Sequence, residues 1–312
     1  MINARWIKII CCPICKGKLL YKVYLYCNRC RRKYLVIDDI PILVADTDKN
    51  NAWQYEHQRK YFDKAYRNVA MEAWQETYNE RIFKLFNPNL NKRKRERLFL
   101  DIGVGGSGYT VIEAAKRGLY SVGCDLSLVG IKKARYLAQK NDVARKTFWV
   151  VCNAEELPFR NGTFTYICAN AILEHLPNER KALKEIDRIA GKKADAFITT
   201  PLMYRFVWPF LIPLNFIHDI RIGHLRRYDE KVFERKLKKT SRFRIIKVYY
   251  TGHLVKTLIF ITSLVFRTHA FDRFAEKVDA LTLSRKFGAS NISIYLRNYT
   301  SLKALSKIKL LS

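Results

Sequence analysis

The sequence lacks a long uncharged apolar run. No stretch reaches the roughly 18 apolar residues that a membrane-spanning helix needs. The nearest candidates, residues 206–217 and 254–266, are interrupted by two prolines and by Lys256 respectively. The first ten residues carry Arg5 and Lys8 and do not have the pattern of a secretory signal. We therefore expect a cytoplasmic protein that is either soluble or in peripheral contact with a membrane.

Acidic residues are also scarce. The chain of 312 residues has 28 Asp and Glu against 58 Lys and Arg, a net charge of +30. Residues 201–312 alone carry 22 basic and 7 acidic side chains, a difference of +15, whereas residues 98–200 carry 15 and 11, a difference of +4. Such a field favours an anionic partner: RNA, an acidic lipid surface or a phosphorylated substrate. A basic proteome in the source organism explains the charge equally well.

Two cysteine pairs lie near the start of the chain, Cys12-Pro-Ile-Cys15 and Cys27-Asn-Arg-Cys30. Each pair can place two thiolates on one tetrahedral zinc ion, and four cysteines complete its coordination, so the site is expected to be structural. We choose Cys12 over Cys11 because it gives the two-residue spacing. Alternating apolar residues around the pairs predict the short strands of a zinc ribbon. Two disulfides are the alternative, which an intracellular location disfavours.

Residues 98–109 combine an apolar run, a glycine-rich turn and the start of a helical pattern at Tyr109. A strand, a glycine loop and a helix N-terminus together form a pocket for a nucleotide cofactor. The spacing of Gly103, Gly105 and Gly108, with Asp125 seventeen residues further on, also fits a dinucleotide fingerprint. A tight turn without any ligand is a further alternative.

Asp101 favours one of these alternatives. It ends the predicted strand directly before the glycines. A carboxylate at this point repels a pyrophosphate, but it attracts a ligand that carries an ammonium and a sulfonium. S-adenosylmethionine (SAM) carries both, so we expect SAM as the cofactor.

Strand and helix patterns alternate as far as residue 200, which predicts an α/β fold with a parallel sheet. Ligands of such sheets bind at the carboxyl ends of the strands, where Asp125 can accept both hydroxyls of a ribose. The predicted strands cover residues 98–100, 120–125, 148–152, 162–168 and 194–199, with helices at 109–118, 129–140 and 178–190. Beyond them we expect a helix at 230–239, strands near 243–250 and 291–297, an apolar insert at 254–275 and a tail from residue 300.

Four motifs between residues 98 and 200 resemble those of class I SAM-dependent methyltransferases, in the group that includes the ubiquinone and menaquinone methyltransferases. They are Asp101-x-Gly-x-Gly, Asp125-Leu-Ser, Ala154-Glu-x-Leu-Pro-Phe and Leu173-Glu-His-Leu. The resemblance implies a doubly wound, mostly parallel, seven-stranded sheet of the Rossmann-like methyltransferase fold. A reversed hairpin is expected to close this sheet at the C-terminal end.

The resemblance also implies how the cofactor is held. The methionyl end is assigned to Asp101, Gly103 and Gly105, the ribose to Asp125 and Leu126, the adenine to Asn153 and Ala154, and the far side of the pocket to Asn170. Two residues depart from the family pattern. Ser107 replaces a common glycine, and Asn153 replaces the usual aspartate, although its amide oxygen can still accept from an adenine amino group.

Residues 1–46 resemble the small zinc-ribbon domains that accompany SAM methyltransferases. We expect three parts: this ribbon, a helical lid and linker at 47–97, and a methyltransferase domain at 98–312 with its substrate region at 201–290. Residues 52–86 contain no proline or glycine and are expected to be helical, and Lys92–Arg95 form a charged linker.

Methyl transfer depends mainly on the alignment of nucleophile and methyl group. His175 and His224 are the candidate catalytic bases, with His218 as a third. Arg226, Arg227 and Tyr228 are expected to contact an anionic group of the acceptor, because a guanidinium suits phosphate and carboxylate.

Three functions stay open at this point. We favour methyl transfer from SAM to a small or lipid-linked acceptor, in a chain that also holds a structural Zn²⁺. The alternatives are methylation of rRNA or tRNA, using the ribbon and the basic surface, and a non-catalytic SAM-binding interaction module. The sequence does not indicate the oligomeric state.

Overall fold

The structure is a computed structural model that describes residues 2–44, 52–67, 80–86, 97–259 and 271–299. The predicted linker Lys92–Arg95 and the tail from residue 300 lie outside these residues, as does part of the apolar insert.

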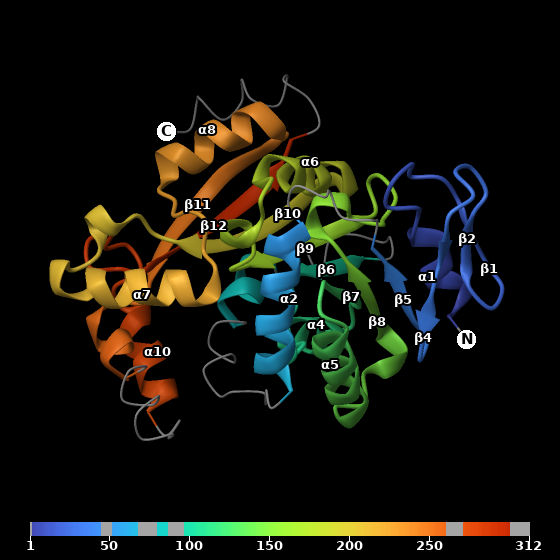
Figure 1. Cartoon of the computed structure of the whole chain (residues 1–312). Coiled ribbons are helices and arrows are strands. Elements are labelled where there is room, and N and C mark those ends of the chain that lie inside the picture. The colour runs from blue at the N-terminus through green and yellow to red at the C-terminus, as the bar shows by residue number, and fades with distance from the viewer. Residues whose placement is uncertain (1, 45–51, 68–79, 87–96, 260–270, 300–312) are drawn as a thin grey trace.

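A nine-stranded sheet forms the centre of the molecule (Figure 1), in the order β11-β12-β10-β9-β6-β7-β8-β5-β4. Strands β5 to β10 pair in parallel, whereas β12 runs antiparallel to both β10 and β11, and β4 runs antiparallel to β5. The strands are β4 (Val36–Ile37), β5 (Ile40–Leu43), β6 (Leu98–Ile102), β7 (Tyr120–Asp125), β8 (Thr147–Cys152), β9 (Phe164–Asn170), β10 (Ala190–Pro201), β11 (Phe243–Thr251) and β12 (Asn291–Asn298). The predicted reversed hairpin at the C-terminal edge is thus confirmed.

Helices cover both faces of this sheet (Figure 1), because successive side chains of a strand point to opposite faces. Phe99 of β6 lies in a core with the helices that follow β6 and β7, whereas Leu100 and Ile102 lie in a second core with helices from the C-terminal half. The helices are α1 (Ala4–Ile9), α2 (Ala52–Tyr66), α4 (Tyr109–Lys116), α5 (Leu128–Lys140), α6 (Glu179–Ile189), α7 (Ile212–Ile222), α8 (Glu230–Thr240) and α10 (Asp272–Ala280). Residues 80–86 are also helical.

Side-chain caps fix where three of these helices begin. The Ser127 hydroxyl accepts the Gly130 N–H at 2.9 Å at the start of α5, and the Asp229 carboxylate accepts the Val232 N–H at 2.8 Å at the start of α8. Asn178 caps α6 in the same way. Such caps satisfy the N–H groups that a helix leaves unpaired at its N-terminus, which explains why these predicted starts are correct to within two residues.

The expectation of seven strands is wrong by two. Residues 40–43, which the sequence assigns to the end of the zinc ribbon, form β5 and pair in parallel with β8, so the N-terminal segment extends the central sheet. Before them, β1 (Leu19–Tyr21), β2 (Leu25–Cys27) and β3 (Lys33–Tyr34) form the expected small antiparallel sheet.

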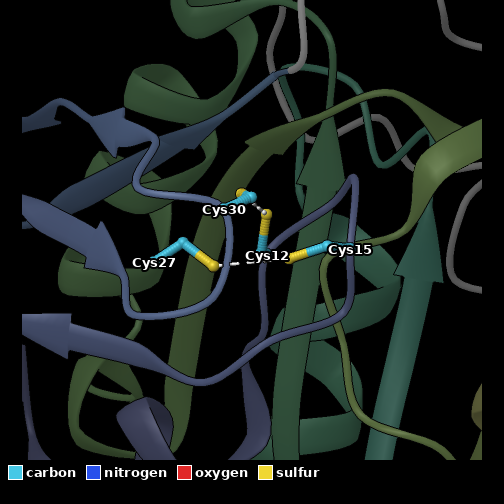
Figure 2. Close-up of side chains that lie close together, drawn as sticks. All are labelled: Cys12, Cys15, Cys27 and Cys30. Atoms are coloured by element: carbon cyan, nitrogen blue, oxygen red, sulfur yellow. Dashed lines mark hydrogen bonds between the residues drawn. The ribbon is translucent and has the colours of Figure 1, made fainter.

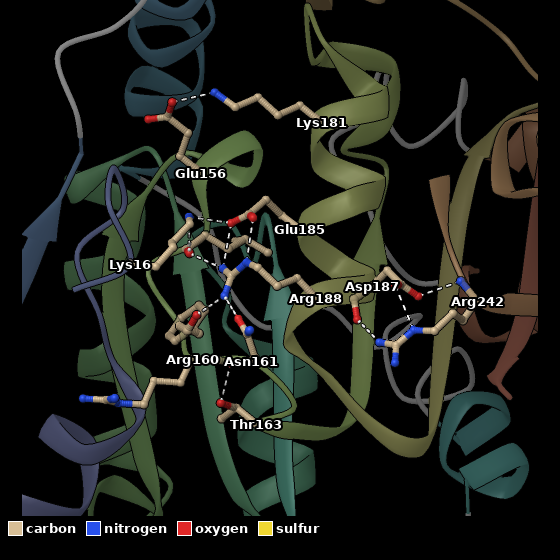
Figure 3. Close-up of polar contacts among 12 residues, drawn as sticks. Lys16, Glu156, Arg160, Asn161, Thr163, Lys181, Glu185, Asp187, Arg188 and Arg242 are labelled. Atoms are coloured by element: carbon tan, nitrogen blue, oxygen red, sulfur yellow. Dashed lines mark hydrogen bonds and ion pairs between the residues drawn. The ribbon is translucent and has the colours of Figure 1, made fainter. Parts of the chain in front are cut away.

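Helix α6 anchors this N-terminal segment (Figure 3). Glu185 of α6 lies 2.7 Å from Lys16 and also 2.7 Å from Arg188, and Arg188 donates to the backbone oxygens of Leu157 and Phe159 at 2.8 and 2.6 Å. Trp6 stacks on Phe148 with ring centroids 5.1 Å apart. The segment therefore shares a core with the central sheet and does not form a separate one.

Candidate active site

A pocket of about 360 Å³ opens at the carboxyl ends of the parallel strands. It lies where the strand order reverses, between β6 and its neighbours β7 and β9, which is the usual ligand position in doubly wound sheets. Eight of the ten predicted cofactor-binding and catalytic residues line it, namely Gly103, Asp125, Leu126, Asn153, Ala154, Asn170, His175 and His224. Asp101 and Gly105 lie directly beside these.

The turn after β6 requires glycine. Gly103 has a φ of +71°, and a Cβ atom there would lie 2.8 Å from Ile172 Cδ1. Gly105 has a φ of +62°. A residue with a side chain would be strained at either position, because this left-handed backbone conformation favours glycine. Glycine also leaves the loop backbone uncovered, so that a ligand can approach it closely.

Asp125 holds this loop from the end of β7. Its carboxylate accepts the Gly105 N–H at 3.0 Å and the Ser127 N–H at 2.9 Å. Burial raises the pKa of this carboxyl above its usual range, and these backbone N–H groups partly offset the rise. A carboxylate has about four acceptor sites, so two hydroxyls of a ribose can still bind to the same group.

Asp101 is buried and incompletely partnered. It is 4% exposed, and its Oδ1 atom has no hydrogen-bond partner in the described structure. Burial raises its pKa to about 7, with a further increase from the negative charge of Asp125. A buried unpaired carboxylate is unfavourable on its own, and a cation placed beside it removes that cost. Asp101 therefore fits a cofactor with a positive group, as the sequence predicts.

Leu126, Asn153 and Ala154, which the sequence analysis assigns to the cofactor, line the pocket. The Asn153 side-chain oxygen accepts the Glu155 N–H at 2.9 Å, so an adenine amino group would have to share this oxygen. Asn170, the last residue of β9, also lines the pocket.

Several side chains of α2 line the pocket, namely those of Tyr55, Gln58, Arg59, Phe62 and Tyr66. The Tyr66 ring packs against the glycine loop and α5, so that a Cβ on Gly106 or Gly130 would lie 2.9 or 2.6 Å from Tyr66 atoms. Further along the helix, Gln58 donates to the His175 backbone oxygen at 2.8 Å. The sequence predicts this helix but gives no role to Tyr66 or Gln58.

Glu174 and His175 are buried and also line the pocket. Neither Glu174 oxygen nor the Nδ1 atom of His175 has a hydrogen-bond partner in the described structure. Burial raises the pKa of Glu174 to about 8 and lowers the pKa of His175 to about 3, with the nearby His224 lowering the latter further. His175 is therefore neutral at pH 7 and a weak base. The sequence motif contains Glu174, but the sequence analysis assigns it no role.

His224 lies beside them. Its Nδ1 atom is 2.8 Å from the Asp219 carboxylate, and its Nε2 atom is 3.7 Å from Glu174. The His175 and His224 ring centroids are 4.7 Å apart. His218 lines the same pocket, and burial lowers its pKa. The structure thus brings all three candidate histidines together.

Arg226, Arg227 and Tyr228 do not line the pocket. Arg227 donates to both Asp219 oxygens at 2.6 and 2.8 Å, and Arg226 donates to the Leu176 backbone oxygen at 2.6 Å. The Tyr228 side chain is buried with its hydroxyl on a carboxylate of α6. These groups are occupied by partners within the protein, so the geometry favours a positioning role over the predicted contact with an anionic acceptor.

The four predicted cysteine ligands converge (Figure 2). The Cys12 and Cys30 sulfurs are 3.6 Å apart and those of Cys15 and Cys27 are 3.4 Å apart. Sulfurs at about 2.3 Å from one zinc ion would lie about 3.8 Å from each other. A Cβ on Gly17 would come within 3.0 and 3.1 Å of Cys27 and Cys15 Sγ atoms, so glycine leaves room for the cluster.

Cys11 does not belong to this cluster. It is buried on its own, and burial raises the pKa of its thiol to about 11. All eight cysteines are free thiols.

Residues 100–197 match a protein-family model described as a methyltransferase domain. The chain is 31% identical over 109 residues to the tocopherol O-methyltransferase of Arabidopsis thaliana, which is 35% of this chain and 31% of that protein. It is 31% identical over 104 residues to the sarcosine/dimethylglycine N-methyltransferase of Aphanothece halophytica, which is 33% of this chain and 37% of that protein. The chain thus spans about a third of the length of the curated relatives it matches.

Solved structures share the fold over a longer stretch. The geranyl diphosphate C-methyltransferase of Streptomyces coelicolor, solved with Mg²⁺, geranyl diphosphate and S-adenosylhomocysteine, covers 81% of this chain and 100% of its own with a TM-score of 0.56 and 13% identity. A sarcosine dimethylglycine methyltransferase from Galdieria sulphuraria covers 71% of this chain and 85% of its own, with a TM-score of 0.53 and 14% identity. The Rossmann-like methyltransferase fold is therefore confirmed.

Proposed function

We propose that this chain transfers a methyl group from SAM to a small-molecule acceptor. The observation that carries the proposal is Asp101, a buried carboxylate with an unpartnered oxygen beside a glycine loop that only glycine can form. Asp125 stands at the end of the neighbouring strand β7, where a carboxylate can accept the hydroxyls of a ribose. The matched methyltransferase domain at residues 100–197 contains all of these residues.

SAM would supply an activated methyl group on a sulfonium. In the reaction the acceptor's lone pair forms a bond to the methyl carbon while the carbon–sulfur bond breaks and its electron pair stays on sulfur. Asp101 would attract the ammonium group, Asp125 would orient the ribose, and α2 would exclude water. The histidine side of the pocket, at His175, His218 and His224, is then left for the acceptor.

We propose further that the acceptor is apolar or lipid-linked and that the protein meets it at a membrane surface. Phe216, Ile217 and Ile220 of α7 are more than half exposed, whereas Ile222 at the end of the same helix lines the pocket. An exposed apolar face beside basic residues suits the surface of an anionic membrane. Among the described residues, no helix is long and apolar enough to cross a bilayer. The relatives' names also include an apolar small molecule, tocopherol.

We also propose that Cys12, Cys15, Cys27 and Cys30 hold one structural zinc ion. The convergence of the four sulfurs supports it, as does the room left by Gly17. The ion would fix the N-terminal segment against α6 and β8. The RNA alternative has no support from the relatives, whose names describe enzymes of small molecules.

The test is methyl transfer from radiolabelled SAM to fractionated lipid, small-molecule and RNA extracts. We expect label in the lipid or small-molecule fraction and none with Asp101→Ala. Label in the RNA fraction alone would show that the acceptor is RNA and not a small molecule. No label in any fraction, together with tight SAM binding, would favour a non-catalytic binding module.

A further inference from the structure

Glu174, His175 and His224 form a cluster whose chemistry the methyl-transfer site does not explain. Each offers one ligand atom, and these atoms lie within 4.8 Å of one another. Ligands about 2.1 Å from one ion lie about 3.0 to 3.5 Å apart, so the three side chains need only a small contraction to share a cation. They come from two distant segments of the chain, which the fold brings together at the pocket.

The cluster contains buried polar atoms that lack partners in the described structure. Both Glu174 oxygens are unpartnered, and this residue is 0% exposed. The His175 ring has a hydrogen bond with the Gly223 backbone, which leaves its Nδ1 atom without a partner. Buried groups of this kind cost free energy unless they are paired or bind a metal. A cation between them would satisfy all three unpartnered atoms.

The residues behind His224 hold it in the orientation that a metal ligand needs. Its Nδ1 atom lies 2.8 Å from Asp219, so Nε2 faces Glu174 with its lone pair. Asp219 is fixed by Arg227 and by the Tyr204 hydroxyl at 2.6 Å. Metal-binding histidines usually donate their second N–H to a carboxylate in this way. This arrangement explains why Arg227 is directed inward and away from the pocket.

We propose that Glu174, His175 and His224 bind a divalent first-row metal ion on the acceptor side of the pocket. Two imidazoles and one carboxylate suit zinc, iron, manganese or cobalt. Three protein ligands leave a coordination position open, as in catalytic sites, and the residues border the pocket. The proposal of a metal site is supported by the geometry of this cluster alone. Only the role of the metal in catalysis rests on the proposed function.

That role follows from the chemistry of the acceptor. An ion at this position would polarise an acceptor hydroxyl and lower its pKa, so that the O–H proton leaves to solvent. The oxygen lone pair then forms the bond to the methyl carbon, and the electron pair of the broken carbon–sulfur bond stays on sulfur.

The test is a Co²⁺ titration of the full chain, followed by visible absorption and metal analysis. We expect about two ions per chain: one with the thiolate-to-cobalt charge-transfer band of the cysteine site and one with d–d bands only, from nitrogen and oxygen ligands. Glu174→Gln and His224→Gln should each lose the second ion and keep the first. His218→Gln is the matched control, because His218 lines the same pocket outside the cluster, and it should keep both.

A wild-type chain that binds cobalt only with the thiolate band would overturn the proposal, as would a second ion that survives in both cluster variants. The wild-type result does not depend on whether a variant folds. SAM binding, measured on the same samples, separates the two claims: SAM binding without a second ion refutes the metal site alone, and a second ion without SAM binding refutes the proposed function.

Discussion

At the scale of single residues, the site is built from carboxylates placed where burial disfavours their charge. Asp101 lies directly before the glycine loop and Glu174 lines the pocket, and burial raises the pKa of the first to about 7 and of the second to about 8. Each is more favourable with a cation beside it. Without a ligand, these two buried carboxylates therefore lower the stability of the folded protein, although the proposed ligands need them.

Asp101→Asn should stabilise the protein without ligand at high pH. The pKa of about 7 in the folded state lies above the ordinary aspartate pKa of 3.8, so the folded state binds more protons, and the stability from this group is lost as pH rises between about 4 and 7. Asparagine removes this loss, which is worth about 2 to 4 kcal/mol. Urea unfolding at pH 5 and pH 8 measures it.

The matched control for this prediction is Asp142→Asn, at an exposed position outside the pocket. It should keep the wild-type dependence of stability on pH. An equally steep dependence in Asp101→Asn would show that Asp101 is not the group responsible.

The sequence predicts some site residues and not others for a physical reason. The local sequence pattern shows where a strand ends. The glycine loop, Asp101 and Asp125 can be recognised from it because each of them lies next to a strand end. The sequence predicts that Arg227 contacts an acceptor, and the structure pairs its guanidinium with Asp219 at 2.6 Å through a tertiary contact. Local sequence cannot tell an arginine that faces a ligand from one that faces a buried carboxylate.

At the scale of elements, strands and helices of the central domain agree with their predicted ranges to within a few residues. The exception is β5, whose residues 40–43 were assigned to the ribbon. Four apolar residues show that a strand is buried but not which sheet it joins. Helix α2 was predicted from its lack of proline and glycine, and its contacts with the glycine loop come from the tertiary structure.

Gly130→Ala should weaken SAM binding and destabilise the protein. Gly130 is the third residue of α5, and inside a helix alanine is normally more stable than glycine by up to about 1 kcal/mol. Here the added methyl group would lie 2.6 Å from the Tyr66 ring and displace α2 from the loop. Thermal unfolding and SAM affinity measure both effects. Adding Tyr66→Ala should restore the normal preference for alanine, and a stabilising effect of Gly130→Ala alone would show that α2 does not pack there.

Cys27→Ser should lower the zinc content by about one ion per chain and should also lower the melting temperature, because metal binding is coupled to folding. Elemental analysis and calorimetry measure these changes. Cys11→Ser is the control and should keep the zinc, since Cys11 lies outside the cluster. Disulfides between these cysteines under native conditions would contradict the metal site.

At the scale of the whole molecule, half of the net charge of +30 and most of the exposed large apolar side chains of the described residues fall in the last third of the chain. Residues 201–312 carry a net charge of +15, from 22 basic and 7 acidic side chains, and α7 presents its apolar face there. Charge brings a protein to an anionic surface, and apolar side chains hold it there.

Replacing Phe216, Ile217 and Ile220 together by serine should reduce binding to vesicles of anionic lipid by at least about tenfold, since each exposed apolar side chain contributes about 1 kcal/mol or more on insertion. Vesicle sedimentation measures it. Tyr136→Ser, at an exposed aromatic residue of α5, is the control and should bind like the wild type. If the triple variant binds vesicles as well as the wild type does, α7 is not the part of the protein that contacts the membrane.

The central claim is that the pocket binds SAM through Asp101 and Asp125, and isothermal titration calorimetry with SAM and NAD tests it most directly. We predict micromolar-range binding of SAM by the wild type, a loss of at least about tenfold in Asp101→Ala and in Asp125→Ala, and unchanged affinity in Asp142→Asn. NAD should give no heat of binding, because Asp101 repels a pyrophosphate. Binding of NAD with no binding of SAM would contradict the account.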